Sequence, residues 1–211
     1  MRLREFQQPV QEYEQGTRRA EDIEKRLTRL GYTMLGGGAD ATAWARDDGR
    51  VIKIIMSDGD SNKPAMKTFR RFLKLTQARP SPHWPRFLPM RDEQGRSSVF
   101  AKFRIGDRNY LQIAMEQLED LYHEEGEMIE TMSAYIQDNR TLGQFLKSIG
   151  RFDSIRDWVE ENKQQIPGLW QAMKDAYSMA NWDYEWDLHG GNVMKRADGT
   201  YVITDPWIRW Q

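Results

Sequence analysis

The spacing of hydrophobic residues changes twice in the first half of the chain. In residues 17–31 apolar side chains recur every three to four positions, which predicts a helix with one apolar face. From residue 32 to residue 55 apolar and polar positions tend to alternate around short turns, which predicts three antiparallel strands. The helical spacing returns from about Pro64 to Ala78, where proline suits the first turn. A helix, a strand meander and an inserted helix are therefore expected in this order.

Two further strands should complete this sheet. The segments SSVFAKFR and NYLQIAMEQ flank a turn at 106–109 and bring the expected antiparallel sheet to five strands. Beyond residue 118 the spacing is helical, and the chain closes with a strand, a turn at Asp198–Gly199 and a second strand. The helices are expected near residues 118–137, 141–149, 152–163 and 168–182. The sequence thus predicts an α+β protein with a β-rich amino-terminal lobe, residues 1–115, and a helical carboxy-terminal lobe, residues 119–211.

The composition narrows the possible functions. The 211 residues include 31 Lys and Arg against 32 Asp and Glu, so the net charge of −1 gives no global attraction to nucleic acid or to an anionic membrane. The absence of cysteine excludes disulfides, thiolate metal sites and a cysteine nucleophile. No apolar run is long enough to span a membrane, and the amino terminus has no apolar signal core. A soluble, cytoplasmic protein is expected.

The strongest chemical signal is the segment DLHGGN near the carboxy terminus. Asp187, His189 and Asn192 match the pattern D-x-H-x-x-N, and Asp205 follows 13 positions later, after the predicted hairpin. Three fixed letters recur by chance in roughly 3 of 100 chains of this length, but the hairpin and the second aspartate make chance a poorer explanation. Asp187 could orient or deprotonate a hydroxyl, whereas Asn192 and Asp205 carry the oxygen ligands that Mg²⁺ prefers.

Two weaker signals lie in the strand meander. Gly36 and Gly38 fall at the first predicted bend, where backbone N–H groups could approach phosphate oxygens, although most such glycine runs are ordinary turns. Lys53 lies in the apolar strand VIKII, and alternation places it on the face opposite Ile52 and Ile54. The alternative for Lys53 is a solvated lysine on an edge strand.

These segments together resemble a known superfamily. GYTMLGGGADATAWA, RVIKI, WDLHGGNVM and YVITDP occur in the order seen in the protein-kinase-like superfamily, which includes the aminoglycoside phosphotransferases. Within it, the chain most closely resembles the early serine/threonine protein kinases of lytic podophages. The resemblance implies a two-lobed kinase-like fold, ATP and Mg²⁺ as cofactors, and phosphorylation of host proteins, the transcription machinery among them, and of the kinase itself.

The resemblance also implies a role for each matching residue. Lys53 would grip the α- and β-phosphates, and Asp187 would act on the accepting hydroxyl beside His189, which would buttress the loop or contact phosphate directly. Residues 116–118 would be the hinge between the lobes, where the backbone of Glu116 and Leu118 recognises adenine. The glycine-loop positions would be filled by Gly36, Gly37, Gly38 and Ala41, and the metal ligands would be Asn192 and Asp205.

Three departures from the kinase pattern keep alternatives open. The inserted helix offers no glutamate to pair with Lys53, since the chain has eight basic residues and no acidic one between Ser61 and Arg91. Pro206 and Trp207 follow Asp205 in place of Phe and Gly, and a short carboxy-terminal lobe without activation segment or later helices is expected. A degenerate kinase-like protein that binds and inhibits a host partner is therefore one alternative, and a small-molecule kinase of the antibiotic type is another.

The basic run itself has two interpretations. It is either a solvated helix face or a docking patch for an acidic partner or another polyanion.

Overall fold

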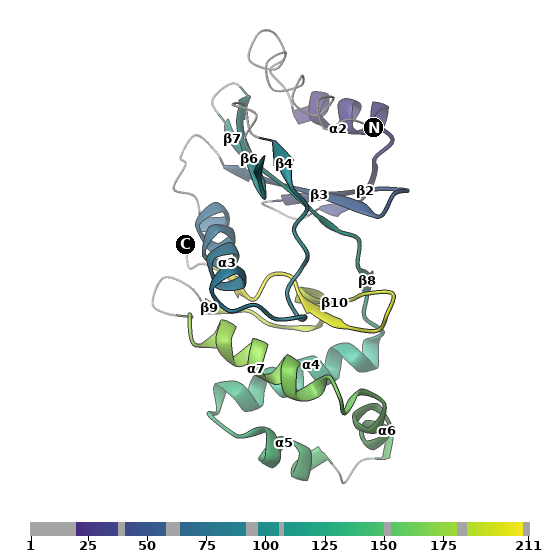
Figure 1. Ribbon diagram of the computed structural model, residues 1–211, viewed down its shortest axis with the longest axis vertical. Coiled ribbons are helices and arrows are strands. Elements are labelled where there is room, and N and C mark those ends of the chain that lie inside the picture. Colours follow the sequence, from purple (N-terminus) through teal and green to yellow (C-terminus); the bar gives the residue numbers. More distant parts are fainter. Residues whose placement is uncertain are drawn as a thin grey trace. The chain divides into compact units, whose positions relative to one another are not determined.

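The computed structural model describes residues 20–37, 41–57, 64–91, 97–105, 108–149, 153–180 and 185–208. The contacts divide the chain into two compact units, drawn in Figure 1. The first unit comprises the chain up to residue 67 together with 86–117, and the second comprises 68–85 together with 118–211. A five-stranded sheet forms the first unit and helices dominate the second, which confirms the predicted α+β class.

The sheet of the first unit is antiparallel throughout, as the alternating pattern predicts. Its strands lie in the order β1-β2-β3-β7-β6. Their bounds are Thr33–Gly37 for β1, Ala41–Arg46 for β2, Arg50–Ser57 for β3, Phe100–Ile105 for β6 and Arg108–Glu116 for β7. A separate two-stranded pair joins β4, Met90–Arg91, to β5, Ser97–Ser98. The sheet places β3 at its centre.

Helix α2, Ala20–Arg29, belongs to the core on one face of this sheet. Leu27 of the helix and Tyr32 just after it are buried with side chains of three strands, among them Ile52 and Ile54. Because side chains alternate along a strand, Lys53 between these two isoleucines lies on the other face of the sheet. The strand on which the predicted orientation of Lys53 depends is therefore confirmed.

Helix α3, Pro64–Ala78, has the bounds that its spacing predicts. Its first turn belongs to the first unit, whereas Thr68 and the residues after it belong to the second. There the ring of Phe72 packs edge-on against Trp84, at a centroid distance of 5.8 Å. It packs in the same way against Trp207, at 6.0 Å. The sequence predicts the whole helix as part of the amino-terminal lobe, whereas these aromatic contacts lie in the second unit.

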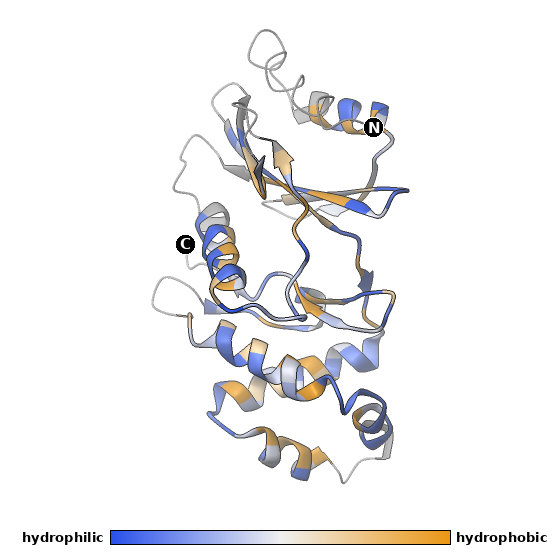
Figure 2. Ribbon diagram, in the orientation of Figure 1, coloured by the Kyte–Doolittle hydropathy of each residue, from blue (hydrophilic) through white to orange (hydrophobic). Residues whose placement is uncertain are grey.

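The second unit has a helical core. Helices α4, His123–Gln137, and α7, Ile166–Tyr177, lie side by side (Figure 1). Helix α5, Leu142–Ile149, joins this pair through the tilted ring contact of Phe145 with Trp170 of α7. The hydropathy colouring marks the apolar stretches of these helices (Figure 2). The fourth helix, α6, spans Asp153–Asn162. Among the helices of the described ranges, none has the length and apolar character needed to cross a bilayer.

Short strands complete the second unit. The predicted hairpin is formed by β10, Val193–Lys195, and β11, Tyr201–Ile203, and β10 also pairs with β8, Glu119–Asp120. A second pair joins β9, Glu185–Trp186, to β12, Trp207–Ile208. The candidate loop DLHGGN lies between β9 and β10, so both of its ends are fixed by strand pairing.

Candidate functional site

Backbone hydrogen bonds bring the segments of Asp187, Asn192 and Asp205 together. The N–H of Asp187 donates to the carbonyl of Pro206 at 3.1 Å, which continues the pairing of β9 with β12. The N–H of Thr204 donates to the carbonyl of Asn192 at 2.9 Å. Asp205 therefore lies between one residue bonded to Asn192 and another bonded to Asp187.

The side-chain amide of Asn192 is fixed by the same loop. Its Nδ2 donates to the backbone carbonyl of Asp187 at 2.6 Å and lies 3.4 Å from the carboxylate Oδ2 of Asp187. Because an amide has its donors on nitrogen and its acceptor on oxygen, this bond leaves Oδ1 of Asn192 as the atom that could coordinate a cation. Asp187, Asn192 and Asp205 are all half-buried, so they can meet a ligand.

His189 supports the turn of the loop. Its Nδ1 accepts the N–H of Gly191 at 3.1 Å, and its Nε2 lies 3.0 Å from Nδ2 of Asn192. Neutral imidazole carries one N–H, so a single tautomer can accept only one of these two contacts, and the protonated ring can accept neither. A Cβ on Gly191 would lie 2.9 Å from Cε1 of His189, so glycine at this position gives the ring its room.

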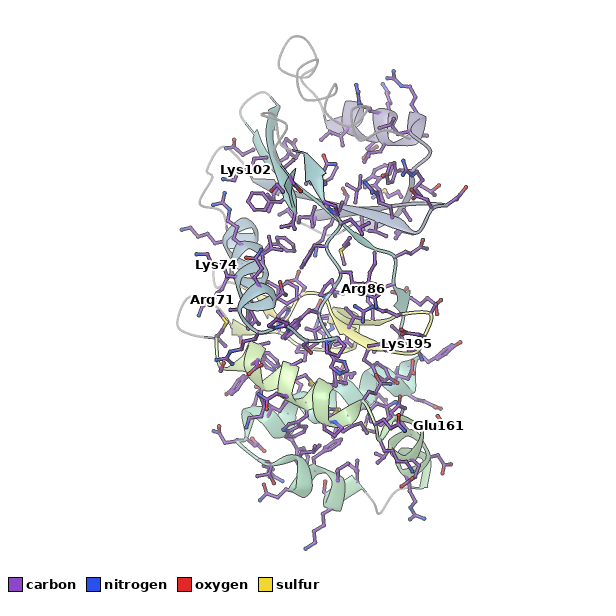
Figure 3. The ribbon with its side chains drawn as sticks, in the orientation of Figure 1. Arg71, Lys74, Arg86, Lys102, Glu161 and Lys195 are labelled. Carbon is purple, nitrogen blue, oxygen red and sulfur yellow. The ribbon has the colours of Figure 1, made fainter. Side chains whose placement is uncertain are left out.

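A half-buried polar cluster anchors the hairpin that follows the loop. Oε1 of Glu125 on α4 accepts hydrogen bonds from Nζ of Lys195 at 2.5 Å and from the hydroxyl of Tyr201 at 2.8 Å. The indole of Trp158 on α6 donates to the same hydroxyl at 2.9 Å. The cluster thereby ties α4 and α6 to β10 and β11; Lys195 is labelled in Figure 3.

The cluster shifts the acidity of two of its members. Burial by itself would raise the pKa of Glu125, but the hydrogen bonds from Lys195 and Tyr201 outweigh it and hold the pKa below the usual value. Burial and the neighbouring Glu125 carboxylate raise the pKa of Tyr201 far above its usual range. Glu125 is therefore ionised and Tyr201 neutral at physiological pH. Sequence analysis missed this cluster because Glu125 and Lys195 lie 70 positions apart and form no local pattern.

Lys53 occupies the central strand of the first unit. It is half-buried and lies opposite Ala43 of β2 and Ile113 of β7. Val51 and Ile55, which share its face, are both buried. The interpretation of Lys53 as a solvated lysine on an edge strand is therefore wrong.

The glycine segment differs in part from its prediction. Gly36 and Gly37 do not form the bend but end β1, where they pair with Ala43 and Thr42 after a β-bulge. The bend itself, with Gly38, lies outside the described residues, and Ala41 opens β2 on its far side. A Cβ on Gly37 would lie 3.2 Å from Cε of Met34 and from Cγ2 of Thr42, a tight fit. Both neighbours are side-chain atoms and Met34 is exposed, so a shift of a few tenths of an ångström would accommodate a Cβ at position 37.

The expected hinge has two of its amides engaged. The N–H of Glu116 donates to the carbonyl of Arg86 at 3.0 Å, and the N–H of Gln117 donates to the carbonyl of Gly49 at 2.9 Å. Adenine recognition by the amides of Glu116 and Gln117 would require breaking these bonds. Adenine recognition by the backbone of Glu116 and Leu118 stays a prediction.

A metal would have few protein ligands here. Within the described ranges no three His, Asp or Glu side chains converge on one point. Magnesium in phosphotransferases is commonly held by one or two carboxylates, with phosphates and water completing its shell. One carboxylate from Asp205 and the amide oxygen of Asn192 fit that requirement in number and chemistry.

The comparisons with known proteins are sparse. No protein-family model and no curated protein matches the chain. Among solved structures, the chain is similar to the amicoumacin kinase hAmiN in complex with AMP-PNP, Ca²⁺ and Ami, at 14 % identity and a TM-score of 0.42, covering 88 % of this chain and 63 % of that one. It is also similar to an aminoglycoside phosphotransferase from Alicyclobacillus acidocaldarius, at 15 % identity and a TM-score of 0.37, covering 85 % and 64 %. The chain spans less than two thirds of either protein. At these TM-scores neither similarity indicates the activity of this chain.

Proposed function

We propose that this chain is an ATP- and Mg²⁺-dependent phosphotransferase that acts as a serine/threonine protein kinase. The observation that carries the proposal is the hydrogen-bonded loop of residues 187–192 in the second unit. Asn192 is held by the carbonyl of Asp187, and Asp205 lies between two residues that are bonded to this loop. These hydrogen bonds support a site in which Asp187 acts on the hydroxyl while Asn192 and Asp205 bind a cation.

Phosphoryl transfer depends mainly on positioning and on charge neutralisation. In the proposed reaction Asp187 orients the accepting hydroxyl and takes its proton, while Asn192 and Asp205 hold the metal. A metal held by these two residues would supply positive charge against the developing charge of the phosphates. Lys53 supplies a further positive charge to the α- and β-phosphates, a role that its half-buried place in an apolar strand suits.

The substrate class follows from the resemblance and from one surface of α3. The resemblance to podophage kinases supports host proteins as substrates. We propose that these proteins are recruited through an acidic segment that meets the basic face formed by Lys67, Arg70 and Lys74, called here the α3 basic face. Its three cations lie on one side of the helix, at spacings of three and four residues.

The described residues supply no intramolecular anion for this face. Arg71 donates to the carbonyl of Met179 and Arg79 pairs with Asp175, so these two cations serve the packing of the second unit. The α3 basic face has no hydrogen bond or ion pair to any described residue, and Lys74 is exposed (Figure 3). Phe69 and Phe72 are buried, so the aromatic rings of α3 offer no surface on which bases could stack. An acidic polypeptide therefore suits this face better than a nucleic acid.

The decisive experiment is phosphate transfer from radiolabelled ATP with Mg²⁺. Candidate acceptors are the protein itself, host lysate and an acidic serine-containing peptide, each compared with Asp187→Ala and Asp205→Ala. Loss of a general base typically lowers the rate by about 10²–10⁴-fold, so Asp187→Ala should be nearly inactive. Asp205→Ala should also be nearly inactive, because it removes the one carboxylate proposed to hold the metal. Asp157→Ala is the matched control, because Asp157 is an exposed aspartate on α6.

The alternatives give different outcomes of the same experiment. If the folded wild type transfers no phosphate to any acceptor, the catalytic proposal fails and a degenerate kinase-like binding protein becomes the better hypothesis. If label goes to an added aminoglycoside and to no protein, the protein-kinase assignment fails while phosphotransfer stands.

A further inference from the structure

Two glycines bring the candidate loop into backbone contact with α4. Gly190 opens the turn Gly190–Asn192, and Gly126 lies in the first turns of α4. A Cβ on Gly190 would lie 2.8 Å from Cα of Gly126, closer than real Cβ atoms come to backbone. A Cβ on Gly126 would lie 3.5 Å from Cα of Gly190, which is ordinary contact. The contact therefore requires glycine at position 190 but tolerates alanine at position 126.

The same helix holds the loop at a second point. The N–H of Gly190 donates to Oε1 of Glu130 at 3.3 Å. Glu130 follows Gly126 by four residues, so the two share one face of α4. One residue of the loop is thus pressed against the helix at Gly126 and hydrogen-bonded at Glu130.

Gly190 is linked to the proposed catalytic groups on both sides. Asp187 precedes it by three residues, and Asn192 follows in the same helical turn, where the N–H of Asn192 bonds the carbonyl of His189 at 3.0 Å. A displacement of Gly190 would therefore disturb the bond from Nδ2 of Asn192 to the carbonyl of Asp187. A shift of about 1 Å in the groups that position reactants can cost on the order of 10²-fold in rate.

We propose that Gly190, held by Glu130 and pressed against the backbone of α4, is a positioning device that fixes Asn192 relative to Asp187. It rests on the proposed phosphotransfer function and adds one positioning residue on α4, Glu130, which touches neither substrate nor metal. Ordinary helix packing is the competing explanation. The two differ in what a substitution changes: positioning governs turnover, whereas packing governs stability alone.

The first experiment compares Gly190→Ala with Gly126→Ala. Because its Cβ has no room, Gly190→Ala should lower kcat by on the order of 10²-fold, with a much smaller change in KM for ATP. Gly126→Ala should retain kcat within about 2-fold, because its Cβ makes ordinary contact and alanine suits a helix. Equal kcat for Gly190→Ala and wild type would overturn the proposal.

The second experiment tests the hydrogen bond. Glu130→Ala should lower kcat several-fold, and Glu130→Gln should restore it, because the side-chain amide oxygen can still accept the N–H of Gly190. Glu127→Ala is the control, since Glu127 is exposed on α4 and faces His123 at 3.3 Å. If Glu130→Ala changes only Tm and leaves kcat as in wild type, the contact is packing and Glu130 is not a positioning residue.

Amide hydrogen exchange separates this inference from the proposed function. Exchange in residues 187–193 should be about 10-fold faster in Gly190→Ala and Glu130→Ala than in wild type, and unchanged in Gly126→Ala. An inactive wild type with this exchange pattern would refute the function but keep the contact that holds the loop. Identical exchange in all variants would refute the device even if the enzyme is active.

Discussion

At the residue scale, the hydrogen bonds around Glu125 depend on one carboxylate. Its Oε1 accepts from Lys195 and Tyr201, and its Oε2 accepts the N–H of Tyr122, the residue before α4 begins. Removing the carboxylate would leave a half-buried ammonium and a buried hydroxyl without their acceptor. The structure thus makes Glu125 more important for stability than its exposed neighbours.

We therefore expect Glu125→Ala to lower the free energy of unfolding by about 2–3 kcal/mol. Glu125→Gln should cost less, because its amide oxygen can still accept two of the bonds. Urea unfolding at pH 7 measures both. The control is Glu124→Ala, an exposed neighbour. It should stay within about 0.5 kcal/mol of wild type, as surface substitutions usually do. Equal stability of Glu124→Ala and Glu125→Ala would show that the cluster contributes nothing.

His83 is a second residue whose surroundings shift its pKa. It is 2 % exposed, its Nδ1 lies 2.8 Å from the carbonyl of Tyr201, and its Nε2 faces the backbone of Gly168. Burial, helped by the positive charge of Arg196, lowers the pKa of His83 below 6.5. The folded state therefore resists protonation that the unfolded state accepts.

Acidification should destabilise the protein through this histidine. The unfolded state binds the extra proton below pH 6.5, so stability is lost as the pH falls from 6.5 toward the lower pKa of the folded state. The slope contributed by His83 is at most about 1.4 kcal/mol per pH unit. Urea unfolding between pH 7.5 and pH 5 should show a smaller pH dependence in His83→Gln than in wild type. Identical pH dependence would contradict the assignment.

The carboxylate of Glu125 acts in a different pH range. Its lowered pKa contributes stability that is present above pH 4.5 and is lost only as the pH falls further. Measurements down to pH 5 therefore keep the contribution of Glu125 apart from that of His83.

At the element scale, the sequence predicts the elements that have a long periodic segment or a clear turn signal, and it misses the very short strands. The bounds of α3 follow from 15 residues of helical spacing, and the hairpin of β10 and β11 follows from its Asp198–Gly199 turn. Strands β8, β9 and β12 have two residues each, too few to show alternation. These short strands nevertheless fix both ends of the candidate loop, so its geometry could not be predicted from sequence spacing.

Helix α3 also illustrates what spacing leaves open. Its apolar face was predicted, but its partners were not, because tryptophans at positions 84 and 207 meet Phe72 only after folding. Trp207 follows Asp205 by two residues, so the packing of α3 supports the segment that carries a proposed metal ligand. Sequence order gives no sign of this coupling.

Truncating Phe72 should therefore destabilise the second unit. The side chain is buried, and Phe72→Ala should cost about 3–5 kcal/mol in the free energy of unfolding. The control is Gln77→Ala on the exposed side of α3. It should change the free energy of unfolding by less than about 0.5 kcal/mol. Urea denaturation followed by tryptophan fluorescence measures both, because Trp84 and Trp207 border the deleted ring. A cost below about 1 kcal/mol for Phe72→Ala would mean that this packing is not tight.

At the scale of the whole molecule, charge is balanced overall but not locally. The net charge is −1, yet α3 contains only basic charged residues. A local basic surface in a nearly neutral protein attracts acidic partners at short range without binding polyanions everywhere. This distribution suits selective docking of an acidic protein segment.

Charge reversal on the α3 basic face should then weaken recruitment but not chemistry. Lys74→Glu should raise KM for an acidic serine-containing peptide several-fold, because an exposed cation becomes a repelling anion, while autophosphorylation and KM for ATP remain unchanged. Lys147→Glu on α5 is the matched control, since Lys147 is also exposed. The difference between the variants should shrink as ionic strength rises, because salt at about 0.15 M already screens charges beyond about 8 Å. Equal KM for the peptide in both variants would leave the α3 basic face a solvated surface and require another site for substrate recruitment.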